Sequence, residues 1–276
     1  MSQFYLTLPS NASMNVYPNN TVAQYTTKLA DTIELDGDWE VGLVEIIYTH
    51  TWESVRANEC KITMREMSDG KVYKVCLGYL PAGYYESGKE LTEEFTKFAN
   101  VCEFTKAPTF KYDSVTNKIS INVPEKMDVT FFGDELIEMS GFRRLKSEGE
   151  SERAQYMTFT NRTVSYRKPE MYTSEFPVDV KRGFYSLYVY CDVLAHMHVG
   201  DTRAPLLRAV AVRGKYGQAV HEWFSKVTYV PLQKKVFDSI EINIMTDTGK
   251  PVPFVGGKSL VTLHFRRSSN PYLLSK

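Results

Sequence analysis

The chain has 276 residues, of which 43% are hydrophobic and 24% charged. These values are typical of a globular protein that can bury a core, and the length fits one large all-β domain or two ordinary domains. The 33 Lys and Arg residues equal the 33 Asp and Glu residues in number. This balance argues against specific binding of nucleic acid as the main role, because such binding relies on a cationic surface.

Aromatic residues are abundant, with 18 Tyr and 15 Phe, and such side chains favour the pleated surface of strands. The N-terminal sequence MSQFYLTLPSNASMN lacks the basic flank and long apolar run of a secretion signal. No stretch approaches the roughly 20 apolar residues that cross a bilayer. We therefore expect a protein that is made and assembled inside a cell, without a membrane partner.

Four cysteines are widely spaced, and none forms a C-x-x-C pair: Cys60, Cys76, Cys102 and Cys191. In a chain without a secretion signal, this spacing predicts free, buried thiols rather than disulfides.

The first sixty residues predict strands. Phe4, Leu6 and Leu8 alternate with polar residues, as in a half-buried strand. A second strand is expected at 21–29. A third, at 39–48, carries apolar residues on both faces and should lie in the middle of a sheet. Two further strands, at 61–67 and 71–79, flank the hairpin signal Ser68-Asp69-Gly70.

The period then changes to that of a helix. Ser87 to Glu90 has the spacing of a capping box, and Leu91, Phe95, Phe98 and Cys102 follow at helical intervals. Short strands are expected at 110–112 and 118–123, and a short helix at 134–139 that ends before Gly141. The charged run RRLKSEGESER at 143–153 is typical of a solvated loop.

Strands return in the last hundred residues, without helices between them. They are expected at 185–192, 205–212, 222–230, 236–246 and 260–266. This pattern predicts an all-β fold, an antiparallel sandwich or jelly roll, with a helix-containing insertion. We assign 1–59 and 176–276 to the jelly roll and 60–175 to an inserted or elaborating α+β region.

Two triplets near the C-terminus resemble enzyme motifs. Asp247-Thr248-Gly249 has the letters of an aspartic protease, but such an enzyme needs two triplets, so this chain would have to act as a homodimer. Gly256-Gly257-Lys258-Ser259 has the end of a phosphate-binding loop, but Val252 replaces the required first glycine and a strand pattern follows instead of a helix. Both triplets are interpreted as turns.

Other catalytic and metal sites lack support. His196 and His198 share one face of a strand, but zinc requires a third and a fourth ligand. Asp192 and His196 imitate part of a triad without a serine in a nucleophile elbow. We expect no catalytic residue, no metal and no cofactor. A carbohydrate- or receptor-binding module stays open as an alternative, because Tyr188 and Tyr190 lie on one face of a strand.

Several phrases of the sequence together resemble one family. They are GDWEVGLVEIIY, PAGYYESGKELTEEF, FFGDELIEMSGF, LYVYCDVL, VGDTRAPLLRAVAV and FDSIEINIMTDTGKPVPFVGGKSLVTLHFRR. This set, spread over about 20–267, is similar to the minor capsid (penton) proteins of Polinton/Maverick elements and adintovirus-like viruses.

The resemblance implies a jelly roll whose five copies close a ring at each icosahedral vertex of a virion. It also implies a double-jelly-roll major capsid protein as neighbour, and no catalytic residues. From composition we expect subunit contacts at the apolar residues of the chain ends, since these need a surface on which to dock: Phe4, Tyr5, Tyr272 and Leu273. Both ends being unstructured in the isolated protein stays an open alternative.

Overall fold

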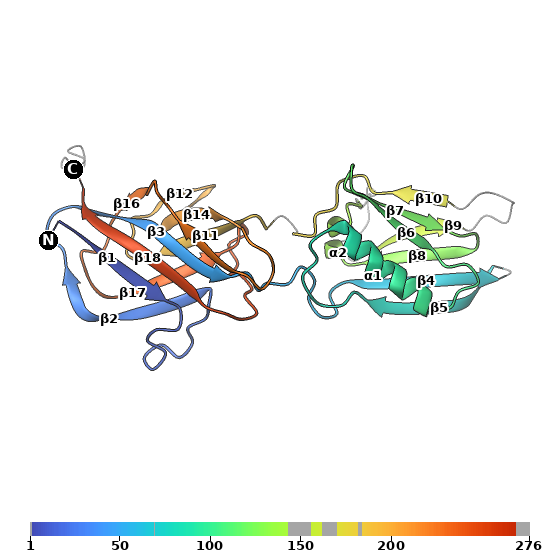
Figure 1. The fold of residues 1–276 in the computed structure, drawn as a ribbon, viewed down its shortest axis with the longest axis horizontal. Coiled ribbons are helices and arrows are strands. Elements are labelled where there is room, and N and C mark those ends of the chain that lie inside the picture. Colours follow the sequence, from blue (N-terminus) through green and yellow to red (C-terminus); the bar gives the residue numbers. More distant parts are fainter. Residues whose placement is uncertain (1, 69, 143–155, 162–169, 182–183, 269–276) are drawn as a thin grey trace. The chain divides into compact units, whose positions relative to one another are not determined.

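The structure is a computed structural model that describes residues 2–68, 70–142, 156–161, 170–181 and 184–268 (Figure 1). The chain forms two compact units. Unit 1 consists of Met1–Trp52 and Phe184–Lys276, and unit 2 of Glu53–Gly183. The inserted region expected at 60–175 lies within unit 2. The unit is longer than expected at both ends, since it spans Glu53–Gly183.

Unit 1 is built from two antiparallel sheets. Sheet A has the order β1-β18-β3-β15, with β16 also paired to β3, and sheet B has the order β14-β11-β17-β2. A small hairpin, β12-β13, is separate. The strands are β1 (Gln3–Pro9), β2 (Gln24–Glu34), β3 (Trp39–Thr49), β11 (Ser186–Cys191), β12 (Met197–Val199), β13 (Thr202–Ala204), β14 (Leu206–Ala211), β15 (Ala219–Trp223), β16 (Tyr229–Pro231), β17 (Val236–Met245) and β18 (Ser259–Arg267).

The path of the chain through these sheets is that of a jelly roll. The strands β1, β2 and β3 alternate between sheets A and B, and the last strand, β18, returns to lie between β1 and β3. The first and last strands are therefore neighbours, blue beside red in Figure 1. Unit 2 enters between β3 and β11. The expectation of an all-β jelly roll with a helix-containing insertion is confirmed.

The core of unit 1 comes from the inward faces of both sheets. In β11 the alternation is as expected: Leu187, Val189 and Cys191 are buried, while Tyr188 and Tyr190 are partly exposed. The central position expected for β3 is confirmed, because β18 pairs with one of its edges and β15 and β16 with the other.

The two enzyme-like triplets are turns at the ends of strands. Asp247 is exposed directly after β17, in a turn closed by the Gly249 amide donating to the Thr246 carbonyl at 3.1 Å. Gly257 precedes β18 and has a φ of +91°. The connection between these turns is held by the Val252 amide, which donates to the Ile244 carbonyl at 3.0 Å.

The expected strand at 222–230 is wrong in its bounds, because the structure has two shorter strands there, β15 and β16. Both pair with β3, β15 along Glu45–Thr49 and β16 along Glu40–Gly42. No local pattern in 222–230 indicates that this segment bends between two parts of the same partner strand.

The described residues of unit 2 form two sheets and two helices. The sheets have the orders β5-β4-β8-β9 and β10-β7-β6. The elements are β4 (Lys61–Ser68), β5 (Lys71–Tyr79), α1 (Gly88–Val101), β6 (Thr109–Asp113), β7 (Lys118–Val123), β8 (Met127–Phe132), α2 (Asp134–Met139), β9 (Tyr156–Asn161) and β10 (Glu170–Thr173). The expected hairpin at 61–79 and both expected helices are confirmed. The charged run at 143–153 lies outside the described residues.

Unit 2 has a core of its own, centred on Phe95 of α1. Its ring lies 5.2 Å from that of Phe110 on β6 and 5.0 Å from that of Phe131 on β8. The helix therefore packs against strands of both sheets. At its start, the expected capping box is only partly formed: Ser87 makes no side-chain cap, and the Glu90 carboxylate instead accepts the Glu86 amide at 2.7 Å.

The expectation of four free thiols is wrong for two of them. Cys76 of β5 and Cys102, directly after α1, form a disulfide with a Cα–Cα distance of 5.8 Å. The rule based on local spacing fails here because the fold brings together cysteines that are 26 residues apart in sequence. Cys60 and Cys191 are free and buried, as expected, and burial raises the pKa of the Cys191 thiol to about 12.

Candidate subunit interface

The outer face of sheet A carries a continuous row of aromatic, histidine and charged side chains. Alternation along β1 places Phe4 inward and Tyr5 outward. Tyr5 is opposite His264 of β18, and its ring stacks on the imidazole at a centroid distance of 4.4 Å. Tyr5 nevertheless keeps 58% of its surface exposed, so its ring is accessible to another molecule at the edge of the sheet.

From Tyr5 the row continues across the sheet. Nδ1 of His264 shares a hydrogen bond of 2.7 Å with the Tyr229 hydroxyl. The guanidinium of Arg266 lies 3.4 Å from the centre of the Tyr229 ring, and its Nε donates to Glu40 at 2.6 Å. Arg266 is thus held by a cation–π contact and an ion pair together, which orders its long side chain in the free subunit.

A second row crosses the same face one step further along the strands. Thr262 of β18 donates to one oxygen of the Glu45 carboxylate at 2.8 Å. The other oxygen of Glu45 lies 2.7 Å from Nε2 of His221 on β15. Beside this pair, Trp223 is opposite Glu45 and 61% exposed. Sheet A therefore has an exposed aromatic ring at each edge and ordered polar groups between them.

His264 is neutral by environment. Burial, and secondarily the charge of Arg266, hold the pKa of His264 below its ordinary value. Only 7% of its surface is exposed, and its Nε2 has no hydrogen-bond partner among the described residues. Because the imidazole is buried and lies between an aromatic ring and a cation, it adds no positive charge to this row at neutral pH.

The residues expected at subunit contacts have different positions. Phe4 packs into the core, with its ring stacked on Phe265 at 4.8 Å and 5.7 Å from that of Trp39. Tyr5 points out, as described above. Tyr272 and Leu273 lie outside the described residues. Trp223 and Arg266 were missed, because an exposed aromatic in a strand pattern and a basic residue near the chain end carry no local signal.

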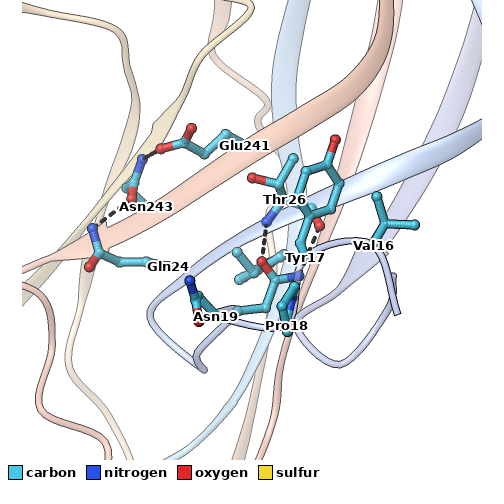
Figure 2. A pocket seen from close by; sticks show the side chains of 10 residues that line it. Val16, Tyr17, Pro18, Asn19, Gln24, Thr26, Glu241 and Asn243 are labelled. Atoms are coloured by element: carbon cyan, nitrogen blue, oxygen red, sulfur yellow. Dashed lines mark hydrogen bonds between the residues drawn. The ribbon is translucent and has the colours of Figure 1, made fainter. Parts of the chain in front are cut away.

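A shallow hollow of about 430 Å³ lies on unit 1 between the β1–β2 connection and sheet B (Figure 2). Asn20 closes this connection: its amide accepts the Thr26 N–H at 2.9 Å and donates to the Thr26 and Ala12 carbonyls. On the strands, Gln24 donates to Asn243 and Asn243 donates to Glu241. Of the ten residues that line the hollow, four carry side-chain amides, two are tyrosines and one is the acidic Glu241.

His196 and Asp192, two further candidate residues, each have polar partners. Nδ1 of His196 lies 3.3 Å from the Gln233 amide oxygen. Both oxygens of Asp192 are occupied, one by Lys234 at 2.5 Å and one by the Glu241 amide at 2.8 Å. Among the residues that the structure describes, no three His, Cys, Asp or Glu side chains are grouped as metal ligands would be. No helix in the same part of the chain is long and apolar enough to cross a membrane.

The fold of this chain is similar to folds found among solved structures. The chain aligns with the mavirus penton protein at a TM-score of 0.52 and 8% sequence identity, over 96% of this chain and 99% of that one. The fold is that of a penton protein. A chain from the cryo-EM structure of the Sputnik virophage aligns at a TM-score of 0.49 and 10% identity, over 98% of this chain and 99% of that one.

No protein-family model matches the sequence, and no curated protein is significantly similar to it. At 8% identity the likeness to the mavirus penton protein concerns the fold alone. It extends over nearly the full length of both chains, however, so it includes unit 2 as well as the jelly roll.

Proposed function

We propose that this chain is a minor capsid (penton) subunit of a virion, from a Polinton/Maverick element or an adintovirus-like virus. The observation that carries the proposal is the shared architecture: a jelly roll with a second unit between β3 and β11, aligned over nearly the whole mavirus penton protein. The zero net charge fits a shell component better than a protein that condenses a genome.

Its mechanism is assembly into a closed ring of five copies. Five-fold contacts are heterologous, since one surface of a subunit meets a different surface of the next. The two edges of sheet A supply such a pair of surfaces: Tyr5 lies on β1 at one edge and Trp223 on β15 at the other. Aromatic residues and arginine are enriched in subunit contacts, so we propose that the Tyr5 edge of one copy meets the Trp223 edge of the next.

The proposal extends to the chain ends and to a partner. Tyr272 and Leu273 stay proposed contact residues, because apolar side chains at a chain end need a surface on which to dock. The double-jelly-roll major capsid protein would surround each ring. Phe4 is a weaker candidate for a contact, because most of its ring is already packed against Phe265 and Trp39.

Light scattering on the purified protein, followed by negative-stain microscopy after co-expression with the major capsid protein, tests this function. We expect a pentamer, either alone or only with that partner. A chain that stays monomeric in both experiments would exclude it. A strict dimer that cleaves peptides, and loses this activity on Asp247→Asn, would instead establish a protease.

Two substitutions test the proposed contact. Tyr5→Ala and Trp223→Ala remove exposed rings and should each weaken the ring by about 1–3 kcal/mol per contact, as loss of interface aromatics commonly does. Tyr185→Ala is the matched control, because Tyr185 is 53% exposed and directly precedes β11 of sheet B rather than lying in sheet A. Equal pentamer yields for Tyr5→Ala and Tyr185→Ala would rule out the β1 edge as the contact.

A carbohydrate-binding role is the second candidate. Tyr190 is opposite Asn243 on the outer face of sheet B, beside the amide-lined hollow of Figure 2. A sugar ring could stack on Tyr190 while the amides and Glu241 bind its hydroxyls. A monomer that binds on a glycan array, and stops doing so on Tyr188→Ala or Tyr190→Ala, would favour this role over a penton.

A further inference from the structure

The strand β5 of unit 2 exposes an unusual number of large apolar side chains. Five of its nine residues are apolar or aromatic and at least 45% exposed: Val72, Tyr73, Val75, Leu77 and Tyr79. Isolated exposed apolar residues are common on folded proteins, but a group of this size on one strand is typical of a surface that meets an apolar partner. We call these five residues the apolar row.

The other face of β5 is fixed by contacts with α1 and the residue after it. Cys76 is bonded to Cys102, directly after the helix. Gly78 lies against Phe98 of the helix, and a Cβ at this glycine would be 2.4 Å from the ring. Because Cys76 and Gly78 point toward the helix, their neighbours in the strand point away from it. The apolar row therefore cannot turn inward while these contacts are in place.

The charged side chains around the apolar row are mainly basic. Lys61 and Arg65 of β4 pair with residues of the row and lie on its face. Asp128 of β8 is opposite Arg65 and only 2% exposed, so it offsets the charge of Arg65 from below the surface. Lys61 and Lys71 have no acidic residue opposite them in the described strands. The strand β5 itself contains no Asp or Glu.

This composition favours a lipid surface over a protein surface. Lysine is depleted in contacts between proteins. At a membrane, by contrast, lysine binds anionic headgroups while its stem lies along apolar groups. Tyrosine suits the same level, because its ring is apolar and its hydroxyl is polar. Tyr73 and Tyr79 lie near the two ends of the apolar row, with Val75 and Leu77 between them.

We propose that the apolar row inserts into the surface of a membrane that contains anionic lipids. Val72, Val75 and Leu77 lie among the upper parts of the acyl chains, and Lys61 and Lys71 bind the headgroups. A strand held in this way lies on the membrane and does not cross it. The sequence-based expectation of no membrane partner rested on the absence of a long apolar run, and a surface made by alternate residues of a strand contains no such run.

Flotation of the purified full chain with lipid vesicles tests the proposal. One set of vesicles contains phosphatidylserine and phosphatidylcholine in equal parts, and the other contains phosphatidylcholine alone. The chain should bind the anionic vesicles roughly tenfold more tightly, because their surface attracts the lysines, and added salt should reduce this difference. Failure to bind the anionic vesicles, or equal binding to both sets, would overturn the proposal. The outcome is independent of the five-fold ring, since the apolar row belongs to a single chain.

Variants locate the contact. Leu77→Glu should weaken binding to the anionic vesicles roughly tenfold or more, because it removes an apolar group and adds a repelled charge. Val115→Glu is the matched control, since Val115 is 92% exposed in a turn of the same unit. It adds the same charge away from β5 and should change binding by less than about twofold. Equal losses in the two variants would refute a contact through β5.

The lysines have a separate test. Lys61→Gln combined with Lys71→Gln should weaken binding to the anionic vesicles and leave binding to phosphatidylcholine unchanged. An anionic preference that persists in this double variant would contradict the assigned role of the two lysines.

Two further measurements separate the remaining outcomes. Circular dichroism establishes that each variant is folded, and Val75→Glu replaces Leu77→Glu if the latter unfolds. Sedimentation without vesicles tests for a second copy of the chain. A concentration-dependent dimer that Leu77→Glu abolishes would show that the apolar row binds another subunit, which contradicts the proposal.

Discussion

Adjacent glycines at the start of β18 have different roles. At Gly257 the φ of +91° lies in the region that side chains avoid, and an added Cβ would be 2.6 Å from Oγ1 of Thr49. At Gly256 nothing lies within 4 Å of such a Cβ. The two residues are identical in the motif, but only Gly257 has a backbone conformation and a close neighbour that require glycine.

This difference gives a first prediction. Gly257→Ala should lower the free energy of unfolding by about 1–3 kcal/mol, because it adds backbone strain and a steric contact. Gly256→Ala should change it by about 0.5 kcal/mol or less. Urea unfolding of the two variants measures both values. A loss of equal size at the two positions would refute the explanation.

The environment of His264 gives a prediction on pH. Its pKa in the folded protein is below the ordinary value of about 6.5. Between these two pKa values the unfolded chain binds more protons than the folded one, so stability rises with pH. The contribution is therefore fully present above about pH 6.5 and is lost as the pH falls toward the folded-state pKa.

His264→Gln should reduce the stability lost between about pH 7.5 and pH 5.5, because glutamine does not titrate in that range. The exposed His198 provides the control, His198→Gln. Urea unfolding at both pH values gives the comparison. An unchanged loss in His264→Gln would show that other groups cause the pH dependence.

At the scale of elements, the disulfide joins the edge strand β5 to the end of α1. Among the described residues β5 has one strand neighbour, and outside the disulfide it reaches this end of the helix through Lys74, which donates to the Glu103 carbonyl. A covalent link there stabilises two elements that would otherwise separate first from the unit.

Replacement of both cysteines, Cys76→Ser with Cys102→Ser, should lower the free energy of unfolding by about 3 kcal/mol, the usual value for a loop of this size. Thermal unfolding with and without dithiothreitol measures the effect. The reductant should lower the melting temperature of the wild type and leave that of the double variant unchanged. A double variant that responds equally to reductant would contradict this origin of the stability.

At the scale of the whole molecule, the two units have separate cores without a shared residue. All three tryptophans, Trp39, Trp52 and Trp223, belong to unit 1. Tryptophan fluorescence thus reports on unit 1, while circular dichroism reports on both units. Separate cores favour separate unfolding transitions.

Phe95→Ala, in the core of unit 2, should destabilise that unit by about 3–5 kcal/mol. The fluorescence transition should stay in place while an earlier transition appears in circular dichroism. Leu263→Ala, in the core of unit 1, is the converse variant, and it should shift the unfolding transition seen by fluorescence. A fluorescence transition that shifts with Phe95→Ala would show that the two units unfold together.

The sequence by itself determined the elements and the fold class. The local patterns are the alternation in β1 and β11, the apolar residues on both faces of β3, the helical spacing of Leu91 and Phe95, and the turn at Asp247. Local backbone preference together with the pattern of burial suffices to produce them. It also showed that the phosphate-loop letters lack their first glycine, with Val252 in its place, and that a single Asp-Thr-Gly triplet would need a second copy of the chain.

Only the tertiary structure decided which distant residues meet. The pairing of Cys76 with Cys102, the stack of Tyr5 on His264, and the division of one expected strand into β15 and β16 depend on which elements become neighbours. The exposure of a side chain is decided in the same way. Phe4 and Tyr5 are adjacent aromatic residues that differ in exposure, and the sequence from Tyr73 to Tyr79 has the pattern of an ordinary strand. A side chain is buried only if another element covers it, and that depends on the packing of the whole unit rather than on its own segment.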